Sequence, residues 1–151
     1  MEIVDGINYL DEIKTLIIEY VKELNRDLSF QNLECELINL KAKYSGNNGK
    51  ILVALVNQKV VGCVGYYRHD QKRCEMKRLY VLPAYRKFKI GYNLVIKIID
   101  LAKNEGYQEM VLDTIKPLKS AIKLYQRLGF KRIPAYYKNP MNDVIYMKLE
   151  L

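Results

Sequence analysis

Residues 74–93, CEMKRLYVLPAYRKFKIGYN, constrain the fold more than any other part of the chain. The first part of this stretch, residues 75–82, is rich in apolar and β-favouring side chains and stops at Pro83, so it predicts a buried strand. A short basic loop follows and leads directly into an expected helix over residues 92–104. A strand, a loop and a helix N-terminus therefore succeed one another without interruption.

The basic loop, residues 86–91, predicts an anion-binding site. The first backbone N–H groups of a helix have no partner within the helix, and the helix dipole favours negative charge at that end. Arg86, Lys87 and Lys89 would surround these donors. The simplest ligand for such a site is a phosphate or a pyrophosphate. The alternative is a solvated basic turn that only begins a helix.

Two segments of the chain carry a resemblance to a known family. Residues 81–91, VLPAYRKFKIG, are similar to the order V-x-P-x-Y/F-R-x-x-G-x-G of the GNAT superfamily of N-acetyltransferases. Residues 120–130, SAIKLYQRLGF, resemble the family's later element A-x-x-L-Y-x-x-x-G-F. The chain departs from the family at Lys89, where relatives carry a glycine, and at Leu118, where many carry an asparagine. Two elements in the expected order make the resemblance specific.

The composition fits a single domain over all 151 residues, since a chain of this length can bury about 70% of its unfolded surface. The 25 lysine and arginine residues exceed the 17 aspartate and glutamate residues, and the net charge of +8 attracts anions without naming them. Neither a signal peptide nor the ~18 apolar residues of a membrane span is evident, so a cytoplasmic protein is expected. Cys35, Cys63 and Cys74 predict reduced core thiols, not disulfides or a metal site.

The N-terminal part predicts a short strand and two helices. The strand covers residues 2–4, and Asn8 is the expected N-cap of an amphipathic helix over residues 10–24. A weaker helix is expected over residues 30–43. Its apolar face consists of Leu33, Leu37, Ile38 and Leu40.

The remainder predicts an α/β fold with a mixed sheet. Further strands are expected over residues 51–56, 60–67, 75–82, 109–114, 130–133 and 144–149. The first three of these run antiparallel as a meander. The helix over 92–104, with Gly106 as its C-cap, implies parallel pairing between the strands that it connects. Pro117 suits the first turn of a last helix that ends at Gly129.

The resemblance implies the GNAT fold: a mostly antiparallel sheet with helices on both faces, in which one parallel strand pair splays around the cofactor. It implies acetyl-CoA (coenzyme A) as co-substrate. The pantetheine arm would lie along the backbone of the central strand, and the pyrophosphate on the N–H groups of the basic loop. The residues expected to hold the cofactor are Leu79, Tyr80, Val81, Arg86, Lys87, Phe88, Lys89, Ile90, Gly91 and Tyr92.

The resemblance also implies direct acetyl transfer, in a ternary complex, to a primary amine of a small-molecule or amino-acid-like acceptor. Tyr125 matches the family tyrosine that often protonates the leaving thiolate, although simple core packing is the alternative. Glu75 is the candidate base for the amine, directly or through water, and its alternative is a surface ion pair with Lys77 or Arg73. Four tyrosines are candidates either for the acceptor pocket or for half-buried packing: Tyr66, Tyr67, Tyr136 and Tyr137.

A second class of function also fits, namely a non-catalytic domain that binds coenzyme A or a polyanion. Nucleic acid is disfavoured, because the helices that begin near Tyr92 and Leu118 are too apolar to lie exposed in a groove. A surface role is expected for His69, which lies in a polar turn. No metal ligands and no membrane partner are expected, and a homodimer is left open.

Overall fold

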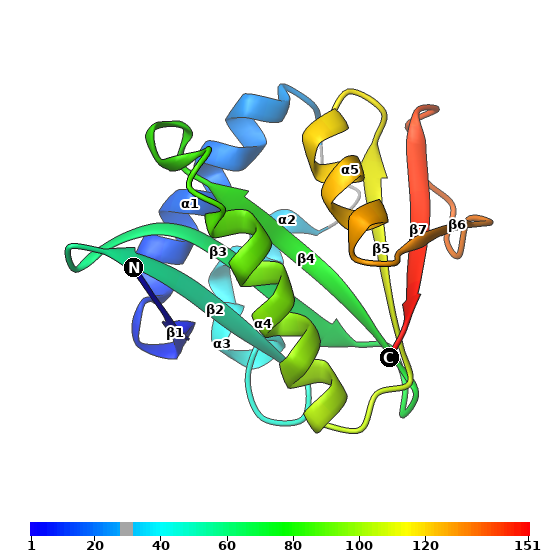
Figure 1. Cartoon of the computed structure of the whole chain (residues 1–151), viewed down its shortest axis with the longest axis horizontal. Helices are drawn as coiled ribbons and strands as arrows, with labels where there is room; N and C mark the ends of the chain where they lie inside the picture. Colours follow the sequence, from blue (N-terminus) through cyan, green and yellow to red (C-terminus); the bar gives the residue numbers. More distant parts are fainter. Residues whose placement is uncertain (28–31) are drawn as a thin grey trace.

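The computed structural model describes residues 1–27 and 32–151, and its centre is a mixed β-sheet (Figure 1). Within these residues the strand order is β1-β2-β3-β4-β5-β7-β6. The strands are β1 Glu2–Asp5, β2 Gly49–Val56, β3 Lys59–Arg68, β4 Arg73–Val81, β5 Glu109–Ile115, β6 Lys131–Ile133 and β7 Val144–Glu150. All neighbouring strands are antiparallel except β4 and β5, which run parallel. The predicted mixed α/β fold is therefore confirmed.

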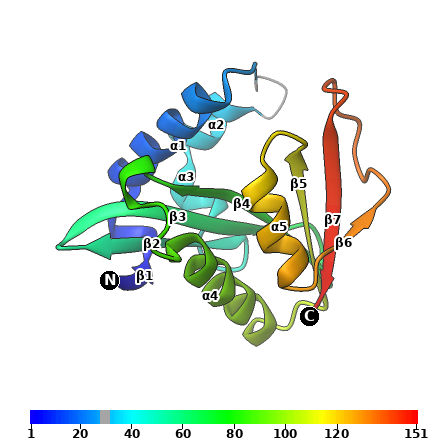
Figure 2. The ribbon, with the colours of Figure 1, turned by 45° about the horizontal axis from the view of Figure 1, so that its top comes forward.

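Helices cover both faces of the sheet (Figure 2). They are α1 Leu10–Leu24, α2 Leu33–Ile38, α3 Leu40–Lys43, α4 Ile90–Asn104 and α5 Lys119–Arg127. One face packs against α4 and α5, through a core that includes Leu94, Ile98 and Tyr125. The other face packs against α1 and α3, through a core that includes Ile13, Ile17 and Leu40. Among the described residues, no helix has the length and apolar character needed to cross a membrane.

A β-bulge at Arg78 changes which side chains of β4 face each core. Cys63 of β3 lies opposite Tyr80, but Gly65 lies opposite Lys77, so β4 contains one extra residue at this point. Arg78 takes a left-handed backbone conformation with φ +63°. The bulge shifts the alternation of side chains by one residue. Cys74 and Met76 before the bulge, and Leu79 and Val81 after it, consequently all contact the core beneath α4 and α5.

The two parallel strands separate soon after they begin to pair. Their register extends from Arg73 opposite Glu109 to Glu75 opposite Val111, although β4 continues to Val81. Figure 1 shows the strands diverging beyond this point. From residue 76 onward, the edge of β4 that faces β5 has no strand partner among the described residues. Backbone groups on this edge can bind a ligand, although the Val81 carbonyl oxygen of the same stretch already accepts a hydrogen bond from Arg86 Nε.

Three sequence predictions about helix ends are wrong. Asn8 does not cap α1 but ends the 3-10 turn Gly6–Asn8, which is capped instead by Asp5. The helix expected over 30–43 is two short helices, because Asn39 leaves the helical conformation; residues 30 and 31 lie outside the described residues. Pro117 precedes α5 instead of starting it.

Two side chains predicted to be buried are exposed. Ile38, expected on an apolar helix face, is 75% exposed at the end of the short α2. Cys35 is exposed on the same helix, whereas Cys63 and Cys74 are buried as expected. The exposure of Ile38 follows from the break at Asn39, which ends α2 there, whereas Cys35 lies within α2, next to Glu36, its one buried residue.

Candidate active site

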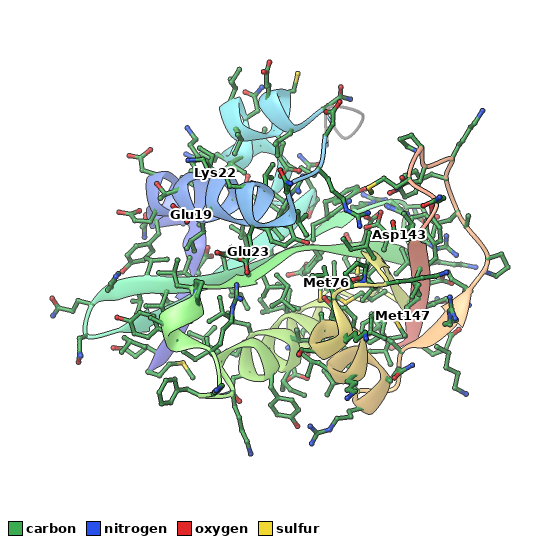
Figure 3. The ribbon with its side chains drawn as sticks, turned by 90° about the horizontal axis from the view of Figure 1, so that it is seen from above. Glu19, Lys22, Glu23, Met76, Asp143 and Met147 are labelled. Carbon is green, nitrogen blue, oxygen red and sulfur yellow. The ribbon has the colours of Figure 1, made fainter. Side chains whose placement is uncertain are left out.

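A cavity of about 730 Å³ lies where β4 and β5 separate. Residues from both faces of the sheet line it. Figure 3 looks onto the end of the sheet where β4 and β5 have separated. It shows α1 with Glu23 on one side of β4, and α4 and α5 on the other side. We call the part lined by α4 and α5 the α4 half; it includes Leu79, Val81, Lys87, Lys89, Ile90, Gly91, Lys119, Tyr125 and Arg127. We call the part lined from the other face the α1 half; it includes Tyr20, Arg26, Lys77, Arg78, Tyr80, Asp113 and Met141.

The N-terminus of α4 has the features of an anion site. Lys89 occupies the N-cap position with φ +59°, and no side chain in the described part of the chain caps the helix. The first N–H groups of the helix therefore lack a side-chain acceptor. A Cβ on Gly91 would contact only Val81, at 3.8 Å, so the space in front of this turn is open. These features fit the pyrophosphate of the predicted cofactor.

Both lysines predicted for this site lie at the cavity, and the structure records no ion pair of Lys87 or Lys89 with a described residue. Their side chains are thus available to a ligand. Phe88 and Tyr92, in contrast, are exposed and do not line the cavity. Only their backbone groups could contribute to the anion site.

Arg86 connects three elements around the cavity. Its Nη1 and Nη2 atoms each donate to the Glu23 carboxylate of α1 at 2.8 Å, and its Nε donates to the Val81 carbonyl oxygen at 3.0 Å. The hydrogen bonds from Arg86 hold the pKa of Glu23 below its ordinary value. Because its guanidinium is already paired, Arg86 fixes the loop in this structure.

Tyr125 lies on α5 and lines the cavity with only 6% of its surface exposed. Its ring packs against Phe130, with the ring centres 5.7 Å apart. Burial raises the pKa of Tyr125 well above that of an ordinary tyrosine. The hydroxyl therefore keeps its proton at neutral pH.

Glu75 is not brought together with Tyr125. It is buried and does not line the cavity. It accepts a hydrogen bond from the Tyr67 hydroxyl at 3.0 Å and lies 2.8 Å from His69 Nε2 and 3.0 Å from Lys77 Nζ. Burial alone would raise the pKa of Glu75, but the hydrogen bond with His69 and the charge of Lys77 lower it to about 2. His69 is exposed in the polar turn after β3, as expected, and this contact places its ring against a buried carboxylate.

Sequence reasoning missed Asp113, the carboxylate of β5 that does line the cavity. It accepts a short hydrogen bond from the Tyr137 hydroxyl, and its Oδ1 lies 3.7 Å from Lys77 Nζ. The signal was present, because Asp113 is the one charged residue within the apolar run MVLDTI. None of the four tyrosines considered for the acceptor pocket lines the cavity, but Tyr137 reaches it through Asp113.

The fold and site define a protein that binds an extended phosphorylated ligand next to a second substrate. A helix N-terminus and an unpaired strand edge, placed in one cavity, are suited to such a ligand. The model of the Acetyltransferase (GNAT) family matches residues 17–130. The chain belongs to this family of N-acetyltransferases, which use acetyl-CoA, and the predicted acyltransferase class is confirmed.

Individual relatives agree with this assignment. An uncharacterised N-acetyltransferase of Schizosaccharomyces pombe is 44% identical over 144 residues, covering 94% of this chain and 88% of the relative. One from Dictyostelium discoideum is 33% identical over 213 residues, covering 100% of this chain and 99% of the relative. A GNAT acetyltransferase structure from Staphylococcus aureus is 28% identical with a TM-score of 0.80, covering 99% of both chains. An Elizabethkingia anophelis GNAT structure with acetyl-CoA bound is 26% identical with a TM-score of 0.63, covering 77% of this chain and 82% of that one.

Proposed function

We propose that this chain transfers the acetyl group of acetyl-CoA to a primary amine by direct attack in a ternary complex. The observation that carries the proposal is the single cavity that passes between β4 and β5. Its α4 half offers an uncapped helix N-terminus and lysines that form no ion pair with a described residue, and its α1 half offers a carboxylate. Holding both substrates in one cavity makes the transfer effectively intramolecular, which accounts for a large part of the rate.

The α4 half is suited to hold acetyl-CoA, which supplies an acetyl group activated as a thioester. The backbone of Leu79, Tyr80 and Val81, on the unpaired edge of β4, would bind the pantetheine arm as an added strand. The N–H groups of residues 87–92 would bind the pyrophosphate, with the Lys87 and Lys89 side chains next to it. Arg86 would keep the loop in place through Glu23.

Tyr125 is the proposed acid. Tyr125 is buried and lines the cavity, and its hydroxyl would supply the proton that the leaving thiolate needs. Glu75 receives a smaller part than the sequence suggested, because Lys77 stands between its carboxylate and Asp113 at the cavity wall. We propose that Glu75 orients Lys77, and that it exchanges protons with the acceptor only through other groups.

Calorimetric titration with acetyl-CoA tests the proposed function. We expect saturable binding at one site per chain, and a loss of affinity of more than about a hundredfold in Gly91→Glu, because a carboxylate would stand before the helix N-terminus. Asn104→Glu adds the same charge at the exposed opposite end of α4 and should bind normally. Absence of binding to the unmodified protein would overturn the proposal. Equal losses of acetyl-CoA affinity in both variants would mean that the pyrophosphate does not bind at the N-terminus of α4.

A further inference from the structure

We infer that the acceptor is an amine without a free carboxylate next to its amino group, and that Asp113 holds its ammonium. This inference rests on the proposed function and specifies the substrate class of the same site. It narrows the expectation of a small-molecule or amino-acid-like acceptor, because free amino acids carry such a carboxylate and amino-acid amides, peptide N-termini and simple amines do not.

The first observation is that every cation named in the α1 half is already paired with a carboxylate. Arg26 pairs with Asp143 through two hydrogen bonds of 2.7 Å. Figure 3 shows Asp143 at the start of β7, across from α1. The other two pairs are Lys77 with Glu75 at 3.0 Å and Arg78 with Glu36 at 2.7 Å.

Among its described residues, this half contains no other cation that is free to pair with a ligand. Arg86, at the boundary between the two halves, is held by Glu23. Residues 28–31, which follow α1 in the chain, read Leu-Ser-Phe-Gln in the sequence and contain no lysine or arginine. A carboxylate that entered the α1 half would have to break an existing ion pair to find a partner.

The second observation is that the carboxylate of Asp113 lacks a close counter-charge among the described residues. Its partners among the described residues are the Tyr137 hydroxyl, which is neutral, and Lys77, which lies 3.7 Å away and is closer to Glu75. Its side chain is 12% exposed, so it remains accessible from the cavity. A partly buried carboxylate in this setting attracts a primary ammonium.

Aromatic rings of the α1 half favour the same ligand. Tyr20 and Tyr80 both line this half with their ring centres 5.5 Å apart, and the Arg86 guanidinium already lies 5.4 Å from the ring centre of Tyr80. Aromatic faces attract cations and repel anions. An α-carboxylate would thus meet Asp113, two aromatic rings and no available cation, whereas an amide or a hydrogen in its place would meet no opposing charge.

Matched acceptors test the inference: phenylalanine, phenylalaninamide and phenethylamine, and the corresponding set built on alanine. Initial rates are measured with saturating acetyl-CoA, and kcat/KM is expressed per unprotonated amine, because the three groups give the amines different pKa values. Leaving a charged group unpaired weakens binding by about tenfold to a hundredfold. We therefore expect kcat/KM of the amide and the simple amine to exceed that of the acid by at least about tenfold.

A pair of variants then tests the structural cause. Asp143→Asn releases Arg26 at the cavity and should raise kcat/KM of the acid relative to the amide by several-fold. Glu109→Gln releases Arg73 from a similar pair of 2.7 Å outside the cavity, and should leave that ratio unchanged. An unchanged ratio in Asp143→Asn, or equal changes in both variants, would overturn the assigned role of the ion pair.

Binding provides a readout that does not depend on turnover. NMR titration of the protein–coenzyme A complex should show the amide and the amine binding at least about tenfold more tightly than the acid. Equal or tighter binding of the acid, or no binding of any amide or amine, overturns the inference while leaving acetyl-CoA binding intact. Failure of acetyl-CoA to bind is a separate result and overturns the proposed function itself.

Discussion

The two halves of the cavity treat charge in opposite ways. In the α4 half, Lys87, Lys89, Lys119 and Arg127 line the wall, and none forms an ion pair with a described residue. In the α1 half, each arginine and lysine of the wall is already neutralised by a carboxylate. An abundance of unpaired cations suits a ligand that carries several negative charges, whereas internally balanced charge with one accessible carboxylate suits a cationic ligand. One cavity can therefore select two substrates of opposite charge.

Breaking the buried network of the α1 half should have the largest effect on stability. Glu36 binds both Lys43 and Arg78 and is almost fully buried. Glu36→Gln leaves the buried Arg78 without a counter-charge and should lower the free energy of unfolding by about 3–5 kcal/mol. Urea unfolding at neutral pH measures this loss.

The control for Glu36→Gln is Glu109→Gln, which breaks the half-exposed pair with Arg73. Partly solvated pairs contribute at most about 1 kcal/mol. Similar losses of stability in the two variants would mean that the charges of the α1 half are solvated, and the contrast between the halves would then fail.

Acid should remove a second contribution from the α1 half. The pKa of Glu75 in the folded state is about 2, below its ordinary value, so the folded state keeps the carboxylate charged where the unfolded chain is already protonated. Its contribution is fully present above about pH 4.5 and is lost as the pH falls toward 2, which amounts to roughly 3 kcal/mol. Between pH 5 and pH 2, the stability of the unmodified protein should therefore fall more steeply than that of Glu75→Gln.

A surface carboxylate provides the control for this titration. Glu150 pairs with Lys148 on the sheet but is largely exposed. Glu150→Gln should follow the pH dependence of the unmodified protein. If Glu75→Gln followed it too, the His69 and Lys77 contacts would not be stabilising the Glu75 carboxylate.

The sequence predicted the α4 half far better than the α1 half, and the reason is physical. The strand, basic loop and helix N-terminus of the α4 half are consecutive in the chain, so local patterns describe them. The α1 half is assembled from residues distant in sequence, such as Arg26 with Asp143 and Glu36 with Arg78. The bulge at Arg78 depends on pairing between β3 and β4, and no local sequence pattern predicted it.

Tyr125→Phe examines the α4 half without changing charge. Removal of the hydroxyl takes away the proposed proton donor, so kcat should fall by about tenfold to a hundredfold while the Kd of acetyl-CoA stays the same. Single-turnover kinetics combined with calorimetry separate the two quantities. Tyr107→Phe removes a hydroxyl outside the cavity and should leave both unchanged. Normal turnover in Tyr125→Phe would exclude the residue as the acid.

Lys89→Gly should have the smallest effect on stability and acetyl-CoA affinity, and it is the most direct test of the contrast between the α4 half and the α1 half. Lys89 replaces the family glycine at a position with φ +59°, where a lysine backbone is strained by roughly 1–2 kcal/mol. The glycine variant should be slightly more stable, yet its Kd for acetyl-CoA should rise about three- to tenfold, because the unpaired ammonium would no longer contact phosphate. The salt dependence of binding, measured by calorimetry, should become shallower as one cation leaves the site.

Gln58→Gly is the matched control for Lys89→Gly. Gln58 has φ +65° in the exposed turn between β2 and β3, so its replacement relieves similar strain at a residue that does not line the cavity. It should reproduce the gain in stability and leave the Kd unchanged. Tighter acetyl-CoA binding in Lys89→Gly alone would mean that the strain of the lysine outweighs its charge. The free cations of the α4 half would then not all serve the phosphates, and the contrast with the α1 half would rest on the helix N-terminus and Lys87.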